Sequence, residues 1–359
     1  MSDIVQNEKR VPVKRWLILG LVALGIYAAF IGPSILKPIS PLVVLPAEPT
    51  GLFIGNFPIT NTIAATLIAD VLLILLAFGA YRFGKSGKLV PSGFYNAFEA
   101  IVEFLWNSVE GVSGKWGKRI FIIPATIFLL VFMANMVKLV PGFESIGYMK
   151  EAHGTKYGFK AVPLISDTLY TIDKGQDIKN ASLAETASPA EGGHAEAAGE
   201  ESHVVGATEI HEDKYYEVVP FLRGSATDIN FPFALAFIAV FATQVYGVWA
   251  LGLGYFEKFF QFKQLVNGGP FGAINFVVGL LEVVLEFAKI LSFGFRLFGN
   301  IFAGALLLSI VGALTAVGVP AGLYLLEVFF GIIQAYVFFL LSTIFISGAT
   351  VSHHGDEHH

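Results

Sequence analysis

The sequence contains no cysteine and few charged side chains. Charged residues make up 14% of the 359 positions and hydrophobic residues 55%, whereas a typical soluble domain has about 25% charged residues. Without cysteine, the chain can form no disulfide framework, thiol nucleophile or cysteine-ligated iron–sulfur site. The mean hydropathy is +0.67. This composition excludes an ordinary soluble domain and indicates a protein embedded in lipid.

Motifs for enzymatic chemistry are also lacking. The glycine- and lysine-rich run at 111–118 (GVSGKWGK) does not have the G-x-x-x-x-G-K-[ST] spacing of a phosphate-binding loop. All 8 histidines lie outside the apolar stretches. We interpret them as solvated side chains, with metal binding as the alternative. We therefore expect no catalysis on this chain, no cofactor or resident metal, and no nucleic-acid partner.

Apolar residues are gathered into about six long stretches. These are Trp16–Ile35, Asn61–Tyr81, Ile120–Val140, Phe231–Leu253, Phe271–Ala316 and Ala321–Val351. About 20 apolar residues of helix cross a hydrocarbon core about 30 Å thick, and irregular backbone cannot face lipid. The last two stretches are too long for upright crossings. The sequence predicts an all-α integral membrane protein with about six hydrophobic helices, including a long tilted or in-plane C-terminal helical hairpin.

Basic residues between these stretches predict the orientation of the chain. They cluster at 9–15, 82–88, 115–119 and 258–263. If the N-terminus is inside, all these groups fall on the inner side, as positively charged loops usually do. We expect both termini on the cytoplasmic side of a bacterial plasma membrane, with a thylakoid membrane as the alternative. The first apolar stretch is predicted to be a retained signal anchor, with a cleaved signal peptide as the alternative.

These features divide the chain into five parts. Residues 1–36 hold the basic N-terminus and the signal-anchor span. Residues 37–141 hold an outer segment without regular structure, the span with Asp70, an amphipathic inner-surface helix and the next span. Residues 142–226 form an acidic outer-side loop that is too polar to fold at its centre. Residues 227–352 hold a span and the long helical hairpin, and residues 353–359 a His-rich inner tail.

A line of mostly polar residues interrupts the fifth apolar stretch. Its members are three or four positions apart and therefore share one face of a helix: Glu282, Glu286, Lys289, Phe293, Arg296 and Asn300. Each ionisable group costs about 2.5–3.5 kcal/mol in hydrocarbon, so this face should meet protein or water. Glu286 and Lys289 could form a purely structural ion pair with Glu282 near water. An ion path is the other interpretation.

Arg296 differs from the rest of this line because no acid lies three or four positions away from it. Its polar neighbours at that spacing, Ser292 and Asn300, are uncharged. Its guanidinium stays protonated at any physiological pH. A fixed cation at membrane depth without a local partner is most simply explained by an anion that visits it from another chain.

The last apolar stretch carries Glu327 and Gln334 on one helical face, because they are seven positions apart. Glycine and proline at 318–322 predict that the chain reverses direction between the two long helices, just before Glu327. An antiparallel hairpin would bring Gln334 towards Arg296. The same hairpin would bring Glu327 close to residues 303–305.

The run LSFGFRLFGNIFAG at 291–304 resembles the a subunit of F-type ATP synthases, and its R-L-F-G-N core is typical of that family. The resemblance covers most of residues 60–350, apart from the acidic loop. Further matching segments are Asp70, residues 90–99, the NMVKLVP run at 135–141, the TDIN run at 227–230 and the region of Gln334.

This resemblance implies a non-catalytic stator subunit of the membrane Fo sector, which passes protons, with sodium ions as the alternative, to and from the carboxylates of a rotating ring of c subunits. Arg296 would face that ring and separate two aqueous half-channels. Asn300 and Gln334 would be its polar neighbours at the interface. The implied partners are the c-subunit ring, the b subunits of the peripheral stalk, the remaining ATP synthase complex and the lipid bilayer.

The resemblance also implies which residues line the two half-channels. The inner half-channel would contain Glu282 and Ser292, with Lys289 and Glu286 among its ion-translocating neighbours. The outer one would contain Glu327 with Asp70 near it. The chain departs from many members at Ala305, where they carry an acid. The outer half-channel would therefore depend more heavily on Glu327.

Two alternatives remain at the level of sequence. An independent ion channel or secondary transporter would use the same polar line without partners, but such folds are typically built from internal repeats with broken helices, and the sequence shows no such repeat. A purely structural membrane scaffold would leave the unpaired Arg296 without an explanation.

Overall fold

The computed structural model describes residues 13–30, 47–85, 93–140, 142–151, 157–165, 169–172, 176–177, 214–259, 269–315 and 318–351. The start of the basic N-terminus, the centre of the acidic loop and the His-rich tail lie outside these ranges. The expectations for those parts stay predictions.

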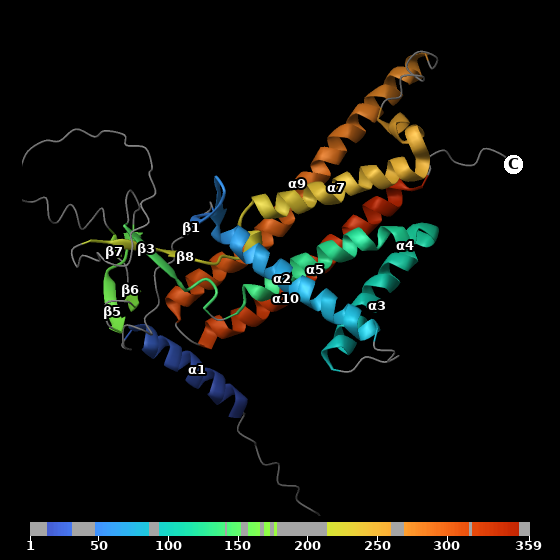
Figure 1. The fold of residues 1–359 in the computed structure, drawn as a ribbon. Coiled ribbons are helices and arrows are strands. Elements are labelled where there is room, and N and C mark those ends of the chain that lie inside the picture. The colour runs from blue at the N-terminus through green and yellow to red at the C-terminus, as the bar shows by residue number, and fades with distance from the viewer. Residues whose placement is uncertain are drawn as a thin grey trace, which may run out of the picture. The chain divides into compact units, whose positions relative to one another are not determined.

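Helices account for most of the described residues (Figure 1). The long ones are α1 (Val13–Phe30), α2 (Asn61–Gly84), α3 (Phe94–Ser113), α5 (Ile122–Val137), α7 (Asn230–Leu251), α9 (Gly269–Leu314) and α10 (Gly318–Ala349). Short helical turns accompany them: η2 (Gly114–Trp116), α4 (Gly117–Ile120), η3 (Ser225–Thr227) and η4 (Gly252–Lys258). Except for the amphipathic α3, the long helices fall on the predicted apolar stretches, because a helix satisfies its own backbone hydrogen bonds in lipid. The predicted all-α membrane fold is confirmed.

Three of the described helices are long and apolar enough to cross a membrane: Asn61–Gly84, Asn230–Lys258 and Val319–Ala349. A fourth crossing results if the bent pair Phe94–Ile120 and Ile122–Val137 is taken as one span. The two parts of this pair meet at 95°. Such an angle suits an amphipathic helix that lies along the membrane surface beside a helix that enters the membrane.

The C-terminal hairpin consists of α9, with 46 residues, and α10, with 32 residues. At a rise of 1.5 Å per residue, α9 measures about 69 Å along its axis, more than twice the hydrocarbon thickness of about 30 Å. It cannot cross upright. Pro320 lies in the first turn of α10, where a missing backbone N–H is tolerated.

Short antiparallel strands precede α2 and flank the acidic loop. β1 (Pro49–Ile54) pairs with β2 (Phe57–Thr60), so the expectation that the outer segment has no regular structure is wrong there. Three more pairs follow: β3 (Gly147–Glu151) with β8 (Tyr216–Pro220), β4 (Tyr157–Gly158) with β7 (Gln176–Asp177), and β5 (Ala161–Ile165) with β6 (Leu169–Ile172). The β3–β8 ladder runs from Gly147↔Pro220 to Glu151↔Tyr216. It holds the two ends of the acidic loop together.

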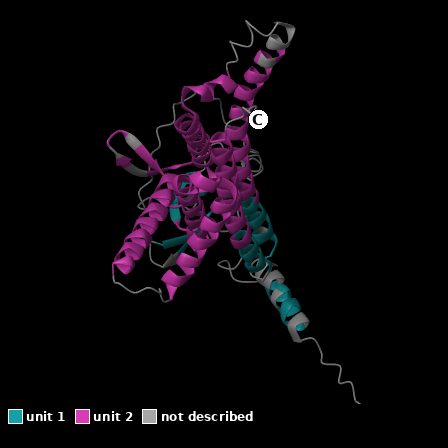
Figure 2. Ribbon diagram, turned by 90° about the vertical axis from the view of Figure 1, so that its right-hand side faces the viewer, with its two compact units in different colours: residues 1–44, 147–220, 304–327 teal, residues 45–146, 221–303, 328–359 magenta. Residues whose placement is uncertain are grey.

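The chain forms two compact units (Figure 2). Unit 1 comprises residues 1–44, 147–220 and 304–327, and unit 2 comprises residues 45–146, 221–303 and 328–359. The core of unit 2 gathers fully buried side chains from five helices: Leu105 (α3), Val131 (α5), Ala236 (α7), Leu297 (α9) and Phe339 (α10). Lipid tails are as apolar as these side chains, so close packing rather than transfer from water holds such a core together.

α5 and α10 approach each other closely at Gly331. A Cβ at this position would lie 3.1 Å from the Cβ of Asn135 and 3.3 Å from the Cε of Met136. The buried Asn135 donates a hydrogen bond from Nδ2 to the Gly331 carbonyl at 3.4 Å. Small residues permit this kind of contact between membrane helices, and a polar side chain then bonds across it.

Candidate ion path along α9

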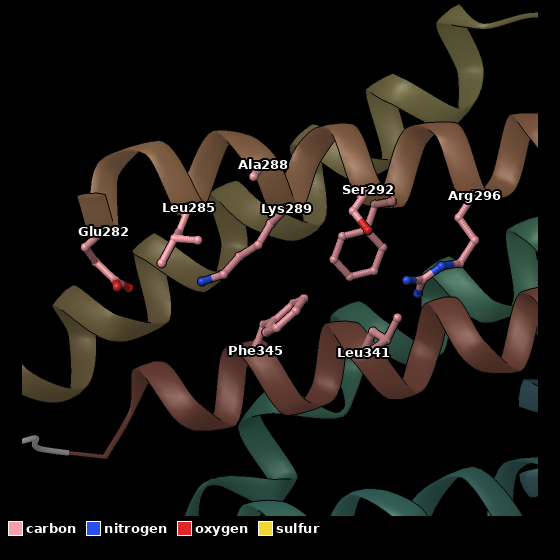
Figure 3. A pocket seen from close by; sticks show the side chains of 9 residues that line it. Glu282, Leu285, Ala288, Lys289, Ser292, Arg296, Leu341 and Phe345 are labelled. Carbon is pink, nitrogen blue, oxygen red and sulfur yellow. The ribbon is translucent and has the colours of Figure 1, made fainter. Parts of the chain in front are cut away.

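A cavity of about 300 Å³ lies between α9 and α10 within unit 2 (Figure 3). Its lining comes from Glu282, Leu285, Ala288, Lys289, Ser292, Phe293 and Arg296 on α9 and from Leu341 and Phe345 on α10. Figure 3 shows the carboxylate of Glu282 towards one end and the guanidinium of Arg296 towards the other. Four members of the predicted line therefore face one continuous space, which is large enough to hold water, namely Glu282, Lys289, Phe293 and Arg296. Glu286 and Asn300 are not part of its lining.

The side chain of Arg296 is exposed, and within the described part of the chain it makes neither an ion pair nor a hydrogen bond. Its apolar neighbours are exposed as well, since Phe295 retains 55% and Leu291 51% of their accessible surface. In a membrane such a surface meets lipid or another protein. A guanidinium facing lipid is costly, so this surface suits a partner chain that brings an anion.

Four charged side chains form an ion-pair network at the Glu282 end of the cavity. The Oε1 atom of Glu286 lies 2.9 Å from the Nζ of Lys289 and 3.1 Å from the Nζ of Lys258. Lys258 also lies 3.6 Å from Glu282. The ion pair between Glu286 and Lys289, which their spacing allows, is therefore present as part of this four-residue network. Two acids and two bases together carry no net charge when all four are ionised.

Lys258 is the member of this network that the sequence spacing does not reveal. It belongs to η4, which continues from the end of α7, and lies 28 positions before Glu286. Its ammonium lies 4.5 Å from the ring centroids of both Tyr255 and Phe259, a favourable cation–π arrangement. A signal was available in the sequence, because Lys258 is the first basic residue after the fourth apolar stretch, which ends at Leu253.

Glu286 is the most buried charged residue of the network, with 8% of its surface exposed. Its Oε1 atom accepts hydrogen bonds from the Nζ atoms of Lys258 and Lys289. Its Oε2 atom is buried without a hydrogen-bond partner among the described residues. A buried ionised carboxylate needs such compensation, because desolvation otherwise outweighs the attraction of a single partner. The two lysines supply this compensation.

Asn300 and Gln334 connect the two helices of the hairpin. The Nδ2 of Asn300 donates a hydrogen bond to the Oε1 of Gln334 at 2.7 Å. Gln334 is buried, with 3% of its surface exposed, whereas Asn300 is exposed one helical turn beyond Arg296. The hairpin thus places the buried amide of α10 beside the arginine-bearing turn of α9.

Glu327 and Asp70 do not line the cavity between α9 and α10. Within unit 1, a Cβ on Gly304 would lie 3.8 Å from the Oε1 of Glu327. This carboxylate therefore lies against residues 303–305, as the predicted hairpin requires. Asp70 is half-buried on α2 in unit 2. Among the described residues it makes no hydrogen bond or ion pair, so no such contact joins it to the polar line of α9.

A buried polar cluster joins the start of α2 to the start of α7. The carboxylate of Asp228 accepts hydrogen bonds from Thr62 Oγ1 at 3.1 Å and from the backbone and side-chain nitrogens of Asn230 at 3.1 and 3.0 Å. Thr62 and Asp228 retain only 2% and 7% of their surface. The sequence shows the TDIN run but not its partner, because Thr62 lies 166 positions away.

The sequence matches the model of the family described as ATP synthase A chain over residues 62–347. Similar proteins include the sodium ion specific ATP synthase subunit a of Propionigenium modestum, 24% identical over 82% of this chain and 75% of the relative. An ATP synthase subunit a of Helicobacter pylori is 23% identical over 80% of this chain and 89% of the relative. That of Moorella thermoacetica is 22% identical over 85% and 98%, respectively.

Proposed function

The chain belongs to the ATP synthase A chain family, the non-catalytic, ion-translocating stator subunits of the Fo membrane sector, and from this premise we propose that Arg296 faces the carboxylates of a c-subunit ring and separates two proton half-channels. The observation that carries the proposal is the position of Arg296. It is exposed among apolar side chains, without an acceptor among the described residues. An ionised carboxylate of a passing c subunit would satisfy it.

The inner half-channel follows the cavity from the ion-pair network to Arg296. Glu282 and Ser292 offer oxygen atoms along this space, and Lys289 and Glu286 complete its charged end. A c-subunit carboxylate that reaches the cavity loses its proton to water there. It then passes Arg296 as an anion, held by a guanidinium that cannot give up its own proton.

The outer half-channel is assigned to Glu327 and Asp70, with Asn300 and Gln334 as polar neighbours of Arg296. The support is the hydrogen bond from the exposed Asn300 to the buried Gln334, which joins α9 to α10, and the contact of Glu327 with the α9 segment at Gly304. A proton that enters there neutralises a c-subunit carboxylate, which can then rotate through lipid. Each charge that crosses 100 mV releases about 2.3 kcal/mol.

The rest of the arrangement follows from the same proposal. The b subunits of the peripheral stalk would hold this chain still while the ring turns. The spans would lie in a bacterial plasma membrane with both termini inside. The orientation is supported by the basic residues at 82–85 and 115–119. A free-standing channel or transporter is the competing proposal, and it requires transport by this chain alone.

The decisive experiment is ATP-driven proton pumping by inverted vesicles that carry the complete complex. Arg296→Ala should reduce pumping to background while the complex assembles in normal amounts. Arg296→Lys should also fail, because an ammonium lacks the planar donor fork and can lose its proton. Pumping at the parental rate by either variant would refute the assigned role of Arg296, and transport by the isolated chain would favour the channel proposal.

A further inference from the structure

The corner between α3 and α5 concentrates positive charge. Lys115, Lys118 and Arg119 lie within η2 and α4, together with Trp116. All three basic side chains are exposed. Within the described part of the chain, none of them forms an ion pair or donates a side-chain hydrogen bond. The corner therefore presents three uncompensated cations in one short stretch.

Arg119 is held by two indole rings. Its Cζ atom lies 5.3 Å from the ring centroid of Trp116 and 4.8 Å from that of Trp249 on α7. The two rings are themselves in edge contact, with centroids 5.7 Å apart. These contacts position the guanidinium, and its N–H donors make no hydrogen bond among the described residues, so they remain available.

The backbone of the corner is fixed by neighbouring helices. The hydroxyl of Tyr246 donates a 2.6 Å hydrogen bond to the carbonyl oxygen of Arg119. Ile120 is fully buried in a cluster with Tyr246 and Ile346. Ser347 on α10 donates a hydrogen bond to the Val112 carbonyl at 3.1 Å. The cationic side chains therefore project from a preorganised turn rather than from a free loop.

The geometry of the corner suits the depth of lipid headgroups. The two parts of the bent pair meet at 95°, so if α5 enters the membrane, the amphipathic α3 follows its surface. Trp249 retains 56% of its surface and offers an exposed indole beside the cations. Tryptophan at this depth is characteristic of the membrane–water interface.

We propose that Lys115, Lys118 and Arg119 form a binding site for the phosphodiester of an anionic phospholipid. The edge of the Arg119 guanidinium can donate two parallel hydrogen bonds to phosphate oxygens. The two lysines add point charges, and the indoles of Trp116 and Trp249 pack against the upper acyl chains and glycerol. The bound lipid fixes the α3–α5 corner at the membrane surface, and this role is independent of the assignment of Arg296.

The test uses the complete complex in phosphatidylcholine vesicles that contain a photoactivatable phosphatidylglycerol in one arm and a photoactivatable phosphatidylcholine in the other. Illumination followed by mass spectrometry maps the lipid adducts on this chain. We expect adducts near residues 115–119 and Trp249 in the phosphatidylglycerol arm. Because each basic residue near an anionic surface changes the binding constant by about five-fold, Arg119→Gln and Lys118→Gln should each lower the yield at this corner by about that factor.

Lys85→Gln is the matched control, because Lys85 is also an exposed cation over an aromatic ring, 4.6 Å from the Tyr81 centroid. It should leave the yield at the corner unchanged. Equal yields with both lipids, or yields that Arg119→Gln and Lys118→Gln both leave unchanged, would overturn the proposal. So would loss of the adduct on addition of inorganic phosphate, which indicates a soluble anion site.

Discussion

Charge compensation differs sharply between the two ends of the α9 cavity. At one end, Lys258 and Lys289 balance Glu282 and Glu286 within 3.6 Å. At the other end, Arg296 has no counter-charge among the described residues. When all five groups are ionised, Arg296 therefore supplies the net positive charge of the cavity. This contrast explains why an approaching carboxylate would be attracted to Arg296 rather than to the lysines.

Lys258 provides a prediction at the scale of the residue. Lys258→Met removes one of the two cations that compensate the buried carboxylate of Glu286, and an imperfectly compensated buried charge costs about 1–3 kcal/mol or more. We expect a several-fold loss of ATP-driven pumping and a lower temperature of thermal inactivation of the complex. Lys258→Arg should retain most of both, because it keeps the charge and the donors.

The control for this change is Lys85→Met, which removes an exposed cation that has no ion pair among the described residues. It should leave pumping and thermal inactivation unchanged. If Lys258→Met and Lys85→Met behave alike, the network at the cavity is dispensable and Glu286 is compensated in another way.

The sequence predicts residue positions best when the partners share one helix. The line from Glu282 to Asn300 follows from spacings of three and four alone. The contacts of Lys258 with Glu286 and of Thr62 with Asp228 join residues 28 and 166 positions apart. Such pairs depend on how whole helices pack, which a local periodicity cannot specify.

At the scale of the element, the approach of α10 to α5 depends on the missing side chain at Gly331. Gly331→Leu would force bulk into a space where even a Cβ lies 3.1 Å from Asn135. Overpacking of this kind costs about 1–3 kcal/mol. We expect fewer assembled complexes on native gels and a lower temperature of thermal inactivation.

Gly348→Leu on the same helix is the matched comparison, because no heavy atom lies within 4 Å of a Cβ built there. It should be tolerated. An equal loss for both substitutions would mean that a leucine anywhere on α10 is harmful, and that the contact of α5 with α10 is not the cause.

The long helices were predictable because their apolar runs exceed the thickness of a membrane, and the hairpin because glycine and proline at 318–322 mark the start of α10. The strands were not. β1 and β2 contain two prolines, Pro49 and Pro58, in a segment rich in turn residues, which favours irregular structure. Their pairing beside α2 overrides this local preference.

At the scale of the whole molecule, the β3–β8 ladder closes the acidic loop at its two ends. Replacing residues 152–215 by Asn-Gly should close the ladder at Glu151↔Tyr216 with a two-residue hairpin turn. A shorter loop also lowers the entropy cost of closure. We expect normal assembly and pumping within about two-fold of the parent, because the residues removed include none of those assigned to the ion path.

Pumping in inverted vesicles measures this outcome, with the parent chain and Arg296→Ala as the upper and lower references. A shortened chain that assembles but pumps no faster than Arg296→Ala would show that the acidic loop takes part in ion transport. A shortened chain that fails to assemble would assign the loop a structural role instead.

The length of α9 has a consequence for timing. Glu282 and Arg296 are fourteen positions apart on one helix, about 21 Å at 1.5 Å per residue. Because a helix about 69 Å long cannot stand upright in a core of about 30 Å, much of this distance is measured sideways in the membrane. If a c-subunit ring turns beside this helix, as proposed, a sideways distance along the helix corresponds to an angle of rotation. The angle through which the ring turns between release of a proton near Glu282 and arrival at Arg296 would then depend on the number of residues between these two side chains.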